Sequence, residues 1–251
     1  MIWNFEIIFI LLAFNLDSYV VLLMLEVNSM KCYCYETETQ LILCVEDVAP
    51  EFEKNLVAAW FEKTDTGFTK IYPMTDKDNG VSAKDIEIVK SNFARLGQSM
   101  FIRNLDWKNI LPFLAKKFSE NNIEWYIFGS VSDAVIGVDI VPHDMDIIVH
   151  TRDFYKVKEM FLDYIVEPFV DNKGTWLVRY FGRLCLGSAY IDVVADEKMN
   201  LENHPYDSVS WNGFNVFVEP FNNRYQLELK RNRPERIKAM EEYMKKLKLT
   251  K

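Results

Sequence analysis

Residues 125–149 read WYIFGSVSDAVIGVDIVPHDMDIIV, and this stretch decides the fold. The apolar run at 125–128 predicts a buried strand, and a Gly-Ser turn then opens a short helix over residues 132–136. Gly137 and Pro142 end that helix, and a second strand is predicted from Asp144 onward. A strand, a turn, a short helix and a second strand in this order indicate a mixed α/β arrangement.

Asp144 and Asp146 lie two positions apart on the second predicted strand. Alternate side chains of a strand share a face, so both carboxylates point the same way while Met145 and Ile147 point into the core. Two carboxylates on one face repel each other unless a cation lies between them, and oxygen ligands of this kind suit Mg²⁺. The pair predicts a magnesium site; the alternative is an exposed strand end with two solvated acids.

The turn formed by Gly129 and Ser130 precedes the acidic pair. Glycine permits close approach of the backbone, serine offers a hydroxyl, and the start of a helix offers free N–H groups. These groups together are typical of a phosphate-binding site. A metal site beside such a turn indicates nucleotidyl transfer.

In these residues the chain resembles the nucleotidyltransferase superfamily, which includes polymerase β, the CCA-adding enzymes and the antibiotic nucleotidyltransferases. Its members share a Gly-Gly or Gly-Ser turn, a short spacer and an Asp-x-Asp pair on the next strand. The segment from Gly129 to Asp146 looks closest to the lincosamide and aminoglycoside members. The resemblance covers residues 123–149, extends to about residue 245 and is absent over residues 1–100. It implies two Mg²⁺ ions and an NTP co-substrate, with Ser130 at the β- or γ-phosphate.

The superfamily uses a third carboxylate on a neighbouring strand, and the resemblance implies that Asp192 supplies it. Asp192 is the only acid in the apolar run AYIDVV at residues 189–194. An unpaired carboxylate is costly to bury, so this position calls for a metal, a cation or a strand end. The alternative is an edge strand with a solvated Asp, and Asp196 is the second choice. In the implied two-metal displacement, Asp144 and Asp146 hold both ions, while Asp192 binds one and deprotonates the acceptor hydroxyl.

Basic residues are concentrated near the C-terminal end, where two helices are predicted to meet near residues 233–234. The basic side chains are Arg224, Lys230, Arg231, Arg233, Arg236, Lys238, Lys245, Lys246, Lys248 and Lys251. Lys230 or Arg231 is expected to reach the triphosphate of a nucleotide; a solvated helix face is the alternative. His143 either orients an aspartate or touches the nucleotide, and a turn histidine with a local hydrogen bond is the alternative.

Composition narrows the class of acceptor. The 251 residues carry 29 basic and 37 acidic side chains, a net charge of −8, and 49% of them are hydrophobic. Such a chain has ample material for a packed core. The acidic balance favours a small acceptor over nucleic acid. A nucleic-acid acceptor is supported by the basic C-terminal end alone. Four cysteines without Cys-x-x-Cys spacing argue against structural zinc and fit free thiols in a reducing cytoplasm, where we expect the protein.

Three regions are expected along the chain. Residues 1–29 form an apolar leader that lacks the charge pattern of a signal peptide. It is a membrane anchor, a segment before a true start at Met30, or an element packed on the protein; membrane contact is not favoured. Residues 30–103 form a small α+β accessory module without a motif, with a turn at 75–80. Residues 104–251 form the nucleotidyltransferase domain, a mixed twisted sheet with flanking helices and a helical tail.

Local patterns predict several elements within these regions. Ser82 and Asp85 have the spacing of a capping box, and Asn212-Gly213 is a hairpin turn. Helices are expected over 50–61, 82–96, 106–121 and 154–164, and strands over 175–185 and 189–194.

The sequence therefore predicts a metal-dependent nucleotidyltransferase that moves an NMP from an NTP, most simply ATP, to a hydroxyl of a small molecule such as an antibiotic. The alternatives are transfer to tRNA or protein, as in toxin-like members of the superfamily, a non-catalytic nucleotide-binding module, and a membrane-tethered interaction protein.

Overall fold

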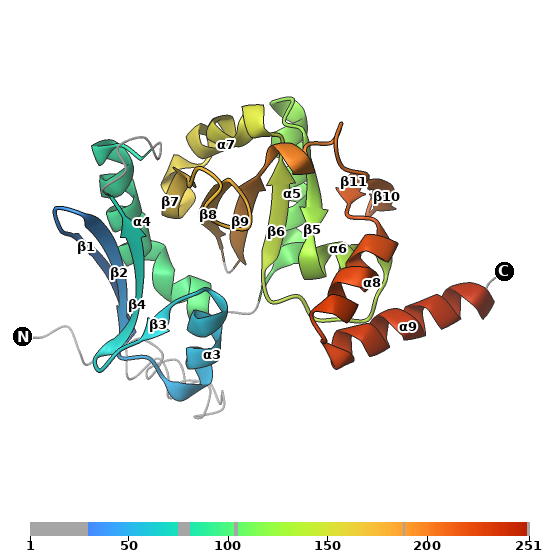
Figure 1. Ribbon diagram of the computed structural model, residues 1–251, viewed down its shortest axis with the longest axis horizontal. Coiled ribbons are helices and arrows are strands. Elements are labelled where there is room, and N and C mark those ends of the chain that lie inside the picture. The colour runs from blue at the N-terminus through green and yellow to red at the C-terminus, as the bar shows by residue number, and fades with distance from the viewer. Residues whose placement is uncertain (1–29, 75–80, 103–104, 188, 250–251) are drawn as a thin grey trace, which may run out of the picture.

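The computed structural model describes residues 30–74, 81–102, 105–187 and 189–249. Two sheets stand side by side, with helices between them and around the larger one (Figure 1). The fold is mixed α+β, with a mixed sheet flanked by helices, as the sequence predicts.

The N-terminal module holds the smaller sheet. Its strands are β1 (Lys31–Glu36), β2 (Gln40–Glu46), β3 (Glu62–Lys63) and β4 (Gly67–Pro73), and its helices are α3 (Pro50–Ala58) and α4 (Ala83–Ile102). The strands pair antiparallel in the order β1-β2-β4-β3. All the residues of β2 except its two end residues are buried, because they form an unbroken apolar run.

The larger sheet has the order β10-β11-β5-β6-β9-β8-β7. Its strands are β5 (Trp125–Phe128), β6 (Met145–Val149), β7 (Ile165–Asp171), β8 (Tyr180–Leu186), β9 (Ala189–Ala195), β10 (Asp207–Trp211) and β11 (Phe214–Val218). The pairs β11–β5 and β6–β9 are parallel, and the other neighbours are antiparallel. The two parallel strands β6 and β9 lie in the middle of the sheet, and they carry the predicted acids.

Helices cover one face of this larger sheet. They include α5 (Trp107–Glu120), α6 (Gly129–Ile136) and α7 (Phe154–Met160). Helix α8 (Phe221–Lys230) packs against α6, and α9 (Pro234–Leu249) packs against α8. Short 3₁₀ turns lie at Thr151–Asp153, Leu162–Tyr164 and Glu197–Met199. Met145 and Ile147 belong to the large core on the covered face, whereas Ile148 and Val194 join a small apolar cluster on the opposite face. Asp146 and Asp192 lie two positions before Ile148 and Val194, so their side chains point to that second, more open face.

The two sheets share one apolar core through α4. This helix packs against β1 on one side and β7 on the other. The buried Asn92 of α4 donates to the carbonyls of Leu162 and Ile165, at 2.7 and 3.1 Å. The division at residue 103 stays a prediction, but the N-terminal module is firmly packed against the larger sheet.

Several local predictions are confirmed. Asp85 Oδ2 accepts from the Ser82 N–H at 2.8 Å, and Ser82 Oγ accepts from the Asp85 N–H at 3.2 Å, the reciprocal pattern of a capping box. Asn212 and Gly213 both have positive φ between β10 and β11, as a type I′ hairpin requires. The four cysteines are free thiols.

Other predicted bounds are wrong. The helix predicted to reach residue 61 ends at Ala58; Trp60 has φ +69° and is 72% exposed. The helix predicted over 154–164 ends at Met160, and the strand predicted from 175 begins at Tyr180. Strand β7 was not predicted, although it is buried along its whole length.

The expectations about residues 1–29 and about the turn at 75–80 lie outside the described residues. Within the described ranges, none of the helices combines the length and the apolar character that a membrane crossing needs.

Candidate active site

The predicted phosphate-binding turn lies directly against the acidic strand. Phe128 at the end of β5 is in register with Asp146 of β6, and α6 starts at the next residue, Gly129. Gly129 has φ +69°, and a Cβ built on it would lie 2.1 Å from Asp146 Oδ2. Only glycine fits here, because both the backbone conformation and the space exclude a side chain.

Asp192 lies on the strand next to the predicted acidic pair. In the parallel pairing of β6 and β9, Asp146 and Asp192 are in register. Residues in register on neighbouring strands point to the same face, so the two carboxylates are directed alike. Asp144 precedes the first residue of β6 and has the same parity as Asp146. The fold thus brings the three predicted carboxylates to one place on the more open face.

The electrostatics of this place are those of crowded acids. Burial, followed by the charges of Asp144 and Asp192, raises the pKa of Asp146 well above its ordinary value of 3.8. Burial and Asp192 also raise the pKa of Asp144, which Arg183, Arg236 and His143 oppose. Half-buried acids that repel one another in this way could hold a cation.

The hydroxyl at the turn is free for a ligand. Ser130 is 1% exposed, and its Oγ has no hydrogen-bond partner among the described residues. Buried polar groups are nearly always paired, so an orphan hydroxyl at the start of a helix fits a bound oxyanion. Ser132, two residues further along α6, also has an unpaired buried hydroxyl.

A buried ion network holds α6 in place. Arg224 of α8 is fully buried and donates to both carboxylate oxygens of Asp133 in α6, at 3.1 and 2.8 Å. It also donates to Glu228 at 2.8 Å. The sequence analysis assigned Arg224 only to the basic tail, but its charge is used inside the protein.

The C-terminal helices bring basic side chains near the acids. Burial and Arg233 lower the pKa of Arg231, and Asp146 is one of the acids that oppose this shift. The charge of Arg236 opposes the rise in the pKa of Asp144. Lys230 ends α8 with its side chain exposed. Arg231 thus interacts electrostatically with Asp146, whereas Lys230 lies exposed at the end of α8.

Arg183 is a partner of the predicted acids that the sequence analysis missed. It lies on β8 in register with Asp192 and is fully buried. Its Nε donates to Asp192 Oδ1, and its Nη2 donates to Oδ2 at 3.0 Å. The signal that could have found it is an arginine between apolar residues of a strand, because a buried arginine requires an acidic partner.

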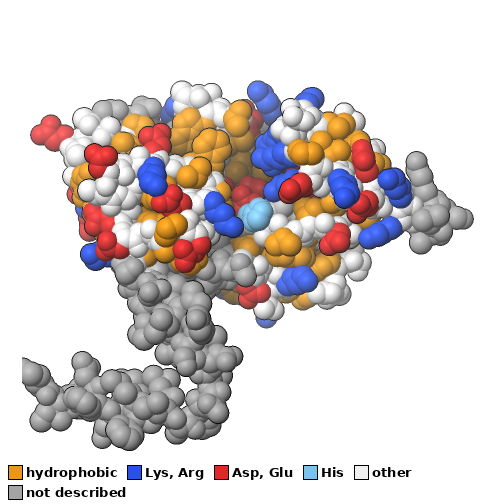
Figure 2. All heavy atoms as spheres, turned by 90° about the horizontal axis from the view of Figure 1, so that it is seen from below, with side chains coloured by type: hydrophobic (Ala, Val, Ile, Leu, Met, Phe, Trp, Pro, Cys, Tyr) orange, Lys and Arg blue, Asp and Glu red, His pale blue; other side chains and the backbone are white. Residues whose placement is uncertain are grey.

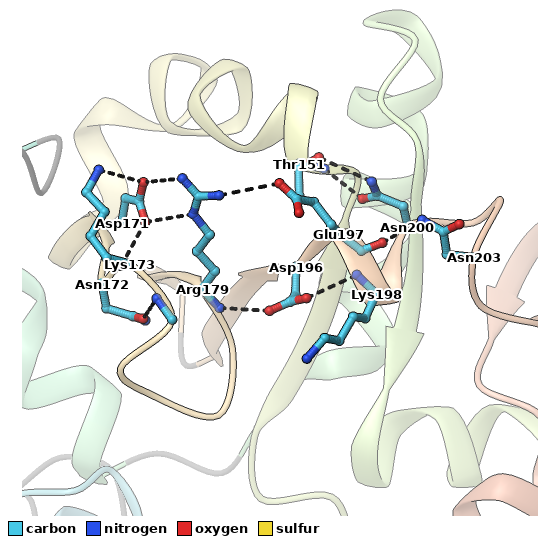
Figure 3. Close-up of polar contacts among 11 residues, drawn as sticks. Thr151, Asp171, Asn172, Lys173, Arg179, Asp196, Glu197, Lys198, Asn200 and Asn203 are labelled. Atoms are coloured by element: carbon cyan, nitrogen blue, oxygen red, sulfur yellow. Dashed lines mark hydrogen bonds and ion pairs between the residues drawn. The ribbon is translucent and has the colours of Figure 1, made fainter.

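Asp196, the second choice for the third acid, has another role. Its side chain accepts from the backbone N–H groups of Lys198 and Arg179 just beyond the end of β9 (Figure 3). It lies four residues from Asp192, roughly 13 Å along an extended strand. Figure 3 shows Asp196 in a polar network with Arg179, Asp171 and Glu197, in which it secures the loop before β8.

The face shown in Figure 2 is hollowed near its middle. Seen from below, where β6 begins, the hollow lies between the N-terminal module and the larger sheet (Figure 2). Acidic side chains lie on its floor, and Lys and Arg side chains gather along one rim.

A different group of metal-ligand atoms lies elsewhere on the larger sheet. In the described ranges, Glu124, His150 and Glu202 have ligand atoms within 4.8 Å of one another; the three aspartates do not form so tight a group. His150 Nδ1 accepts from the Arg152 N–H, so its Nε2 carries the proton and donates to Glu202. That tautomer leaves no lone pair for a metal, and the group is best explained as a hydrogen-bonded surface cluster.

Comparisons with known proteins show likeness of structure only. No protein-family model and no curated protein matches the chain. A Thermotoga maritima protein assigned as a nucleotidyltransferase is 18% identical, with coverage of 56% of this chain and 94% of its own and a TM-score of 0.43. The lincosamide antibiotic adenylyltransferase LnuA, solved with lincomycin, is 12% identical, with coverage of 55% and 98% and a TM-score of 0.44. ANT(2")-Ia, solved with adenylyl-2"-tobramycin, is 12% identical, with coverage of 53% and 86% and a TM-score of 0.38.

These structures are proteins of the kind that residues 123–149 resemble. At such identities and TM-scores they do not tell what this chain binds or transfers. Its function has to be argued from its own residues.

Proposed function

We propose that this protein is a metal-dependent nucleotidyltransferase that moves a nucleoside monophosphate from an NTP to an acceptor hydroxyl. One observation carries the proposal: Asp146 and Asp192 are in register on parallel strands, and Asp146 lies against the Gly129 turn with its free Ser130 hydroxyl.

The donor set fits magnesium, because all of its ligands are carboxylate oxygens. Asp144 and Asp146 would hold two ions, with Asp192 on one of them. When bound, the ions neutralise the charge that develops on the phosphoryl oxygens.

The remaining roles belong to groups of the chain itself. The Ser130 hydroxyl and the N–H groups at the start of α6 bind the β- or γ-phosphate, and Arg231 or Lys230 approaches the same phosphates. Asp192 accepts the proton of the acceptor hydroxyl. The acceptor oxygen then forms a bond to the α-phosphorus, the bond from that phosphorus to the bridging oxygen breaks, and pyrophosphate leaves. His143 is exposed beside Asp144, and a role in contacting the base or sugar fits its place.

A small molecule is the acceptor that the charge favours. The net charge of −8 disfavours nucleic acid, because binding to a polynucleotide depends on neutralising its phosphates. Transfer to tRNA is the second candidate, since Arg231, Arg233 and Arg236 lie close together where α8 meets α9. A cytoplasmic protein with ATP as donor is the simplest setting for either reaction.

The test is incubation with α-labelled ATP, CTP, GTP or UTP, Mg²⁺, and separate pools of antibiotics, tRNA and protein. Label in the antibiotic pool together with pyrophosphate is expected, and Asp146→Asn should abolish both. Label in tRNA or protein would replace the acceptor but keep the chemistry. Stabilisation by ATP and Mg²⁺ without any pyrophosphate would leave only a nucleotide-binding module.

A further inference from the structure

We infer that the N-terminal module positions the third carboxylate through a buried relay of charged groups. The relay, defined here as Lys70, Tyr72, Glu167, Arg183 and Asp192, begins on β4 and ends at the site. This inference rests on the proposed function and gives the N-terminal module a task in it.

The last link of the relay fixes the orientation of Asp192. Arg183 binds both oxygens of Asp192 from the neighbouring strand, so this carboxylate cannot rotate without breaking a bidentate ion pair. The Arg183 guanidinium is also packed over the Tyr190 ring at 4.9 Å. Its Nη1 is directed away from the site and donates to Glu167 at 2.6 Å and to the Ala59 carbonyl at 3.1 Å.

Glu167 connects the two modules. It is fully buried, and its Oε1 is occupied by Arg183. Its Oε2 accepts from Lys70 Nζ at 2.6 Å and from the Tyr72 hydroxyl, both on β4 of the N-terminal module. Lys70 also donates to the Ala59 carbonyl, the same oxygen that Arg183 binds. The N-terminal module therefore supplies two of the three side chains that bond Glu167.

The charges of the relay balance only when Lys70 is present. Two cations, Lys70 and Arg183, face two carboxylates, Glu167 and Asp192. Burial alone would raise the pKa of Glu167, but Arg183 and Lys70 hold it below its ordinary value. Without Lys70, Arg183 would have to neutralise two acids, and its guanidinium would be drawn toward Glu167. Its ion pair with Asp192 would weaken, and Asp192 would then bind a metal ion less tightly.

The test compares three variants of the full-length protein. Lys70→Met removes the charge, Lys70→Arg keeps it, and Lys63→Met removes a lysine of the same module that pairs with Glu53 at the surface. Mn²⁺ affinity is measured directly by electron paramagnetic resonance without nucleotide, and kcat and KM for ATP are measured where turnover is found.

Lys70→Met should weaken Mn²⁺ binding and lower kcat by about 10- to 100-fold, the usual effect of removing a group that orients a ligand, with KM for ATP little changed. Lys70→Arg should restore most of both, and Lys63→Met should equal the wild type. A folded Lys70→Met with wild-type Mn²⁺ affinity and kcat would overturn the inference, because the network would then only stabilise the fold. If Lys70→Met does not fold, Tyr72→Phe, which keeps every charge, should weaken Mn²⁺ binding measurably; unchanged binding would also overturn it.

The two proposals can fail separately. A wild type that binds Mn²⁺ but never forms pyrophosphate refutes the transfer reaction, while the Mn²⁺ affinities still decide the relay. A wild type with turnover, together with relay variants that bind Mn²⁺ normally, refutes the relay alone. A wild type that binds no Mn²⁺ refutes both.

Discussion

Gly129 and Asp146 are in such close contact that the carboxylate occupies the space of a missing side chain: Asp146 Oδ2 lies 2.1 Å from where a Cβ of residue 129 would be. The turn that is proposed to bind phosphate and the acid that is proposed to bind metal therefore form one rigid unit. A side chain added at residue 129 must displace Asp146.

Gly129→Ala is expected to abolish turnover and to destabilise the protein by more than the roughly 1–2 kcal/mol that a left-handed backbone costs alanine. The excess arises because Asp146 must move away from the new methyl group. Gly213→Ala is the matched control, because Gly213 has φ +82° with nothing within 4 Å of a built Cβ. Pyrophosphate release and urea unfolding of both variants check this; equal losses of stability would show that the close contact is unimportant.

Asp146→Asn is expected to remove activity but to raise the Tm of the metal-free protein at pH 7. The folded state raises the pKa of Asp146 above 3.8, so the native protein binds this proton more tightly than the unfolded chain. The free energy of unfolding of the wild type therefore falls as pH rises from 3.8 through the raised pKa. The asparagine variant lacks this fall, so its advantage should be largest at pH 7–8 and vanish near pH 4.

Thermal melts in EDTA across this pH range measure the effect, at about 2–4 °C for each kcal/mol of repulsion removed. An asparagine variant less stable than the wild type at pH 7 would contradict the crowding of acids at this site. Added Mg²⁺ should reverse the order, because only the wild type retains all the ligands.

Ser130→Ala is expected to raise KM for the NTP by about tenfold without loss of stability. The hydroxyl is buried and unpaired in the free protein, so its removal breaks no hydrogen bond there, whereas a bound phosphate would lose one to a charged group, worth about 1.5–3 kcal/mol. Ser132→Ala serves as the control, since its hydroxyl is equally buried and unpaired but lies beyond the turn. Steady-state kinetics and melts decide; a larger effect at Ser132 would place the phosphate elsewhere.

Arg224→Met is expected to destabilise the protein by about 3–5 kcal/mol, because it leaves Asp133 and Glu228 as buried acids without their main partner. Burial already raises the pKa of Asp133, which Arg224 opposes. Arg233→Met removes a half-exposed partner of the same Glu228, 3.6 Å away, and should cost less than about 1 kcal/mol. Urea denaturation compares the two, and similar costs would show that α6 does not depend on Arg224.

The sequence predicted the central part of the site because its parts are local. The turn at Gly129 and the spacing of Asp144 and Asp146 are features of one short stretch, and backbone geometry alone directs both acids to one face. Asp192 could be predicted because a single acid in an apolar strand is costly to bury unless a cation or a metal ion binds it. Whether these residues catalyse a reaction stays a proposal.

The rest of the site depends on contacts between distant residues. Lys70 and Glu167 are in contact although they lie 97 positions apart in the sequence, and Arg183 and Ala59 lie 124 positions apart. No periodicity or motif records such pairs. The same limit explains the wrong end of the helix expected over 50–61. The helix ends at Ala58, and the Ala59 carbonyl accepts from the distant Lys70 and Arg183.

The long span of the Lys70–Glu167 contact has a consequence for how the protein is made. On the ribosome, β4 emerges well before β7 exists, so Lys70 and Tyr72 must await the acid that they will bind. Neither half can complete its polar interior by itself. The first half should therefore not be interchangeable with an unrelated domain. In such a chimaera, the buried Glu167 would lack the two partners that Lys70 and Tyr72 provide.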